Sequence, residues 1–175
     1  MQTRIENQAT GTQIIVVRPA AETGGAFTET IIVLPAGAQG PPLHLHPLQE
    51  EHFETLEGIL GIRVGNRTVV VPPGRSFTVP PGVPHSWFGV GGRAVRCRAI
   101  WKPSLHIEYL MEELTQSANR RKSKSPSLLE AAYVLHRIRG EYFLAGAFPK
   151  ELQILLFAIL ALLGKSFGLV KAKRN

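Results

Sequence analysis

Two short motifs place three histidines and a glutamate where they could bind one metal ion. The first motif carries His44, His46 and Glu51, and the second is a Pro-Pro-Gly-Val-Pro turn that leads into His85. Imidazole nitrogens together with a carboxylate oxygen suit borderline divalent metals such as iron, nickel, manganese, copper or zinc. Four protein ligands leave coordination positions open, so the motifs indicate a reactive or substrate-binding centre rather than a closed structural one.

The spacing within the motifs predicts the strands that position these side chains. Alternate side chains of a strand share a face, so His44 and His46 should point the same way, about 7 Å apart. Glu51 opens a run that ends at Gly58, and if this run is a strand antiparallel to that of the two histidines, Glu51 returns beside them. His85 follows a turn and should begin another strand.

Both motifs resemble those of the cupin family. The matching positions are His44, His46, Glu51, Gly58, Gly74, Pro80, Gly82 and His85. The sequence departs from the family pattern at Ala38, where a glycine is usual, and at Gly89, where the family prefers asparagine. The resemblance covers about residues 10–103. It implies a small jelly-roll β-barrel that binds one divalent transition metal through His44, His46, Glu51 and His85.

One of the ligands and two residues near them have a predicted role in catalysis or substrate binding. Glu51 is the candidate catalytic base, because its carboxylate could accept a proton if it detached from the metal. Phe53 and Trp87 each lie two positions beyond a ligand, so strand parity puts them on the same inward face. We therefore predict that both line an apolar substrate-binding pocket; packing in the barrel core is the alternative for each.

The pattern of short segments predicts an all-β domain over residues 1–103 followed by a helical extension over residues 104–175. Segments rich in β-branched residues, separated by Gly and Pro, recur as far as residue 103 and are typical of a sandwich or barrel. Beyond that point we predict helices over 105–117, from composition, over 126–140, where apolar residues recur at helical spacing, and over 149–164. We expect the extension to pack on the barrel or on a dimer partner.

The third predicted helix contains an uninterrupted apolar run, residues 154–163. This run is too short to cross a bilayer, which needs about 20 apolar residues. A helix that is apolar on all sides is either buried by protein or placed at an interface. One interpretation is therefore a helix that covers the barrel or joins two subunits. The other is a membrane-surface helix, aided by Lys165, Lys171, Lys173 and Arg174.

The net charge of +7 is concentrated in two basic clusters, residues 120–124 and 171–174. No aromatic residue interleaves them, so we interpret both as solvated segments and expect no nucleic-acid partner. Cys97 is the single cysteine and cannot form an internal disulfide. Together with the polar segment after Met1, it predicts a cytoplasmic protein.

The resemblance to cupins implies a metal-dependent enzyme that acts on a small organic molecule, with a quercetinase-like dioxygenase as the leading hypothesis. Isomerases, decarboxylases and lyases of this family use similar ligands, and a fold does not choose among them. One alternative is a non-catalytic module whose metal only positions a small molecule. Another is a regulatory protein with DNA-binding helices, which the apolar third helix disfavours. The resemblance also implies a homodimer.

Overall fold

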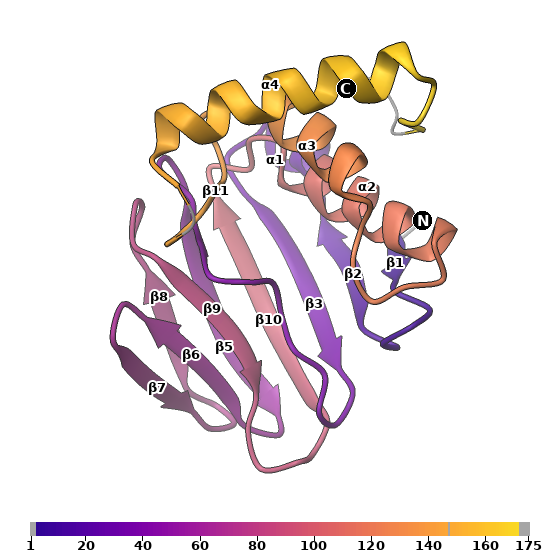
Figure 1. The fold of residues 1–175 in the computed structure, drawn as a ribbon. Coiled ribbons are helices and arrows are strands. Elements are labelled where there is room, and N and C mark those ends of the chain that lie inside the picture. Colours follow the sequence, from indigo (N-terminus) through magenta and orange to yellow (C-terminus); the bar gives the residue numbers. More distant parts are fainter. Residues whose placement is uncertain (1–2, 147, 172–175) are drawn as a thin grey trace.

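Two antiparallel sheets form a sandwich in the computed structural model, and helices gather along one side of it (Figure 1). The structure describes residues 3–146 and 148–171. One sheet has the strand order β1-β2-β3-β10-β5-β8 and the other β11-β4-β9-β6-β7. The strands are β1 Arg4–Glu6, β2 Gln13–Arg18, β3 Thr28–Leu34, β4 His44–Leu45, β5 Glu50–Glu57, β6 Leu60–Val64, β7 Arg67–Val71, β8 Ser76–Val79, β9 His85–Gly89, β10 Val95–Lys102 and β11 Phe143–Leu144.

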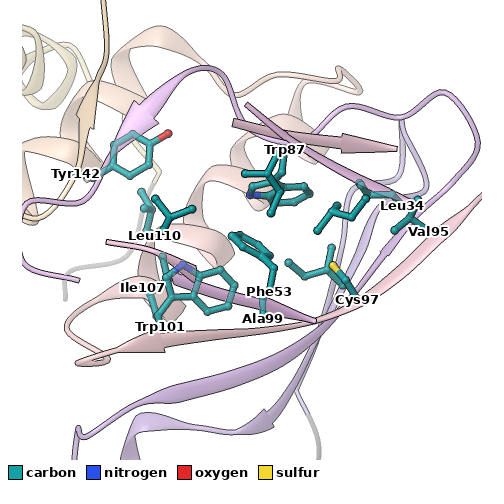
Figure 2. Packing of buried hydrophobic residues seen from close by; sticks show 14 of the residues in the cluster. Leu34, Phe53, Trp87, Val95, Cys97, Ala99, Trp101, Ile107, Leu110 and Tyr142 are labelled. Atoms are coloured by element: carbon teal, nitrogen blue, oxygen red, sulfur yellow. The ribbon is translucent and has the colours of Figure 1, made fainter. Parts of the chain in front are cut away.

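The core lies between the two sheets. Burial alternates residue by residue along β3, β5 and β10, because successive side chains of a strand point to opposite faces. The inward positions include Phe53 and Cys97, both fully buried, beside Leu34 and Val95 (Figure 2). Burial raises the pKa of the Cys97 thiol to about 12, so this cysteine is an inert core residue.

The expected jelly-roll fold is confirmed. The class all-β describes the sandwich but not the whole chain, because the described residues also form four helices. These are α1 Ala20–Thr23, α2 Ile107–Arg120, α3 Leu128–Arg137 and α4 Lys150–Ser166. The three long helices coincide with the predicted ones, with ends shifted by a few residues. The short helix α1 and the strands β1 and β11 were not predicted, since each is too short to show a periodic pattern.

Strand β11 ties the helical extension to the barrel. Phe143 and Leu144 pair antiparallel with Leu45 and His44 of β4, which adds a strand from the extension to the five-stranded sheet. The buried amide of Gln153 in α4 accepts a hydrogen bond from the backbone N–H of Leu144 and donates one to its carbonyl. This amide therefore holds the first turns of α4 against β11.

Glu130 joins the helices of the extension to one another. Its carboxylate, at the start of α3, accepts hydrogen bonds from the Ser117 hydroxyl and the Arg120 guanidinium of α2. Burial alone would raise the pKa of Glu130, but these two bonds and one from the backbone N–H of Lys171 hold it below its usual value. The carboxylate is thus kept ionised where α2, α3 and the end of the described chain meet.

The outward face of α4 is apolar and exposed. The helix packs on α3 with one side, and four leucine or isoleucine side chains on its other side are at least 45% exposed, namely Leu152, Leu155, Ile159 and Leu162. Among the described helices, none combines the length and apolar composition needed to cross a bilayer. Lys173 and Arg174, which contributed to the membrane-surface interpretation, lie outside the described residues.

Two glycines provide a matched test of how tightly the connections between the two sheets are packed. Gly58 and Gly74 both have positive φ, +73° and +76°. A Cβ at Gly58 would collide with the carbonyl oxygen of Ala94, whereas one at Gly74 would meet nothing within 4 Å. We expect Gly74→Ala to cost about 1–2 kcal/mol of unfolding free energy through backbone strain alone. Gly58→Ala should cost more than about 3 kcal/mol because the collision is added. Urea unfolding measures both, and equal losses would contradict the packing described at Gly58.

Candidate metal centre

The four predicted ligands reach one point from both sheets of the sandwich. His44 in β4 lies directly opposite His85, the first residue of β9, and His46 follows β4. Glu51 comes from β5, which pairs with β10 and β8 in the other sheet. Glu51 does lie beside His44 and His46, but its strand does not pair with theirs. The neighbours of β4 are β9 and β11, so the carboxylate instead crosses the space between the sheets.

A backbone hydrogen bond joins the turn before His85 to the first motif. The N–H of Gly82 donates to the carbonyl oxygen of His46 at 2.7 Å. Gly82 has a φ of +77°, which a glycine adopts without strain. The turn residue of one motif thus fixes the backbone of a ligand in the other.

The candidate ligand atoms form a compact group that is buried from solvent. One atom from each of His44, His46, Glu51 and His85 lies within 4.8 Å of the others, and all four side chains are almost fully buried. Glu51 Oε1 is 2.7 Å from His46 Nε2 and 3.8 Å from His44 Nε2, and Oε2 is 3.3 Å from His85 Nε2. The carboxylate is therefore surrounded by three imidazole edges.

The hydrogen bonds of the outer nitrogens fit a metal at this point. Nδ1 of His44 lies 2.8 Å from the carbonyl oxygen of Pro42, and Nδ1 of His85 lies 2.9 Å from that of Val83. A carbonyl oxygen only accepts, so each Nδ1 carries a proton, and each Nε2 of a neutral ring turns a lone pair inward. His85 Nε2 and Glu51 Oε2 are buried without a hydrogen-bond partner. Unsatisfied buried acceptors facing one point are what a cation would satisfy.

The electrostatics of the cluster favour a neutral His44 and an ionised Glu51, whereas Glu51 draws His85 toward its protonated form. Burial lowers the pKa of His44, which keeps that ring neutral. Burial opposes ionisation of Glu51, but the electrostatic influence of His46 and the close imidazole nitrogens of all three histidines hold its pKa well below the usual range. Burial also acts to lower the pKa of His85, yet its contact with Glu51 raises it. The ionised carboxylate attracts positive charge into the cluster, and a metal ion would supply that charge.

Tyr142, which precedes β11, covers the histidines and was missed by the sequence analysis. Its ring stacks on that of His44, with centroids 4.8 Å apart and an interplanar angle of 14°, and meets His46 edge-on at 5.2 Å. Burial, reinforced by the charge of Glu51, raises the pKa of Tyr142, so its phenol is a neutral hydrogen-bond donor. The only sequence signal was the β-prone run that starts at Tyr142, directly after Gly140 and Glu141.

The two predicted substrate contacts occupy different positions. Trp87 lines a cleft of about 590 Å³ together with His44, His46 and Glu51. Phe53 is fully buried beside Trp87, with ring centroids 6.0 Å apart, and does not line the cleft. The N–H of Gly40 bonds to the Trp87 carbonyl oxygen. A substrate contact by either aromatic residue stays a prediction.

His52 and His106 lie apart from the cluster. His52 is next to Glu51 in β5 but has the opposite parity, and its Nδ1 lies 2.8 Å from the hydroxyl of Thr78. His106 precedes α2 and contacts the carboxylate of Glu141. The His52 side chain thus faces away from the centre.

Comparison with known proteins agrees with this architecture. Residues 30–101 match the family model described as "Cupin domain". The chain contains a small cupin domain. No curated protein matches the sequence at a significant level.

Solved structures show the same cupin fold. A sugar phosphate isomerase of the cupin superfamily from Silicibacter pomeroyi has a TM-score of 0.51 at 18% identity, covering 59% of this chain and 73% of that one. A predicted oxalate decarboxylase from Thermotoga maritima has the same TM-score and identity, covering 59% of this chain and 92% of that one. At this identity the likeness concerns the fold alone.

Removing one ligand should abolish most metal binding, whereas the same substitution at a neighbouring histidine outside the site should not change it. We expect protein from metal-replete medium to hold about one ion per chain. His46→Ala should lose most of it, whereas His52→Ala, whose side chain points outward, should keep it. Elemental analysis gives the stoichiometry. Added metal should raise the melting temperature of the wild type and of His52→Ala but not that of His46→Ala. Equal metal contents in the two variants would refute the site.

Proposed function

We propose that the cupin domain binds one divalent transition metal through His44, His46, Glu51 and His85 and acts as an enzyme on an apolar organic substrate. The observation that carries the proposal is that three of these four buried residues, His44, His46 and Glu51, line the cleft. Three imidazoles and one carboxylate suit iron, nickel, manganese, copper or zinc, and four protein ligands leave room for a further one.

The residues around the centre have distinct roles in this proposal. A bound divalent metal would supply Lewis acidity and open coordination positions for an oxygen atom. Glu51 would hold positive charge at the centre and could receive a proton from the substrate. Trp87 provides an apolar wall for the substrate, and the neutral phenol of Tyr142 can donate a hydrogen bond to an oxygen atom beside His44.

Oxygenation of the substrate is the reaction that we propose first, as in quercetinase-like dioxygenases. Isomerisation, decarboxylation and elimination remain alternatives, because the same ligand types serve all of these reactions in cupins. A non-catalytic module that only holds a small molecule is the second candidate function. It is favoured by the depth of the ligand cluster, where all four side chains are at most 3% exposed.

Oxygen consumption distinguishes these possibilities. We expect iron- or nickel-loaded protein to consume oxygen with at least one member of a panel of flavonols, diketones and long-chain acids. Glu51→Gln should reduce that rate by about 100-fold or more if the carboxylate acts as a base. His52→Ala serves as the control. A ligand that raises the melting temperature but is recovered unchanged would support the binding module instead.

We also propose that α4 joins two copies of the chain in a homodimer. Leu152, Leu155, Ile159 and Leu162 are spaced by three and four residues, as in the seam between paired helices. With the neighbouring exposed residues Leu163, Phe167 and Leu169, they present an apolar area on the order of 800 Å², similar to what each partner buries in a stable complex.

The charges beside this stripe favour an antiparallel, two-fold arrangement. Glu151 and Lys165 lie near opposite ends of α4 and are separated by about four helical turns, so they share one flank. In an antiparallel pair each Glu151 would face the Lys165 of the other copy, which a two-fold axis repeats. The cytoplasmic location, the lack of a nucleic-acid partner and the division at residues 103/104 likewise remain proposals.

Charge reversal on the flank tests the dimer without disturbing the stripe. We expect a dimer in light scattering after gel filtration. Glu151→Lys should weaken it about tenfold through like-charge contacts, and Glu151→Lys with Lys165→Glu should restore it. Leu155→Glu with Leu162→Glu should yield monomers. A wild-type monomer that floats with phosphatidylserine vesicles would overturn the dimer and identify the stripe as a membrane-surface contact.

A further inference from the structure

The cleft beside the metal centre extends along helix α2. One face of α2 lines it at helical spacing, with Ile107, Leu110, Met111, Leu114, Thr115 and Ala118, and Arg121 directly after the helix continues this face. A helix rises 1.5 Å per residue, so this face spans about 21 Å. A volume of about 590 Å³ spread over that length leaves room for one extended chain.

The inner end of the cleft adjoins the metal centre. Ile107 and Leu110, in the first turns of α2, lie between Tyr142 and Trp101 (Figure 2). Tyr142 stacks on His44, and Trp101 also lines the cleft. An apolar chain lying along α2 would therefore end against the ligand cluster.

The outer end of the cleft is basic. Arg121 and Lys124, at and beyond the end of α2, line the cleft and are exposed. Among the described residues neither forms an ion pair, and the guanidinium of Arg121 donates only to the carbonyl oxygen of Pro126. The adjacent Arg120, in contrast, is paired with Glu130 at 2.7 Å. Two cationic groups thus stand without a carboxylate partner at the mouth of an apolar cleft.

We infer that the cleft binds a long-chain aliphatic carboxylate, with its acid group at Arg121 and Lys124 and its chain along α2 toward His44. The guanidinium matches a carboxylate in shape and charge, and the apolar lining matches the chain. A compact, planar ligand would leave the basic end unused. That the far end of the chain reacts at the metal rests on the function proposed above, whereas binding in the cleft does not.

Intrinsic fluorescence reports the binding directly, because both tryptophans of the chain, Trp87 and Trp101, line the cleft. Palmitate, kept below its aggregation concentration, should change the emission of metal-loaded protein in a saturable way. Arg121→Gln with Lys124→Gln should weaken palmitate about tenfold or more. Hexadecanol, which lacks the charge, should bind both proteins alike. Lys122→Gln is the matched control, since Lys122 lies between the two but does not line the cleft.

Variants that block the cleft and a variant that cannot bind metal distinguish a failure of the palmitate proposal from a failure of the metal proposal. Leu114→Phe or Ala118→Phe, halfway along α2, should obstruct the chain and reduce palmitate binding, as measured by calorimetry. His44→Ala with His46→Ala should lose the metal yet still bind palmitate. Absent palmitate binding in metal-loaded protein, or binding that ignores Arg121 and Lys124, overturns the inference and leaves the metal proposal standing. Binding that requires the metal places the acid group at the centre and also overturns it.

Discussion

A single buried carboxylate, held among three imidazoles, is the interaction on which the functional half of this structure depends. Glu51 extends from the six-stranded sheet toward His44, His46 and His85, which belong to or adjoin strands of the other sheet. An unpaired carboxylate in such surroundings would be costly to ionise, so the cluster is stable only with positive charge beside it. Protons on the imidazoles provide part of that charge, and a metal ion would provide it more completely.

The barrel gives this cluster its rigidity. Each ligand lies in a strand or directly beside one, and the outer nitrogens of two histidines are fixed by backbone carbonyls of their own segments. The backbone bond from Gly82 to His46 joins the two motifs. A site built in this way needs little reorganisation to receive an ion, because its geometry is imposed by sheet hydrogen bonds rather than by the ion.

The helical extension shapes what can reach the centre. Strand β11 extends the sheet beside β4, Tyr142 covers the histidines, and α2 forms one wall of the cleft. Without these segments the ligand cluster would lack its aromatic cover and its elongated approach. The features that could select a substrate therefore come largely from the part of the chain that the family model does not match, since that match ends at residue 101.

The spacing of residues in the sequence was enough to predict several local features of this structure. The alternation of β3, β5 and β10, the positive φ of Gly58 and Gly82, and the inward position of the four ligands all follow from constraints that act within a few residues. Only the tertiary structure decided which sheet carries Glu51, that Tyr142 stacks on His44, and that α4 exposes its apolar side. These depend on strand pairing and helix packing between distant segments. A short strand such as β11 pairs wherever a free edge meets it, and no periodicity in its own residues specifies that edge.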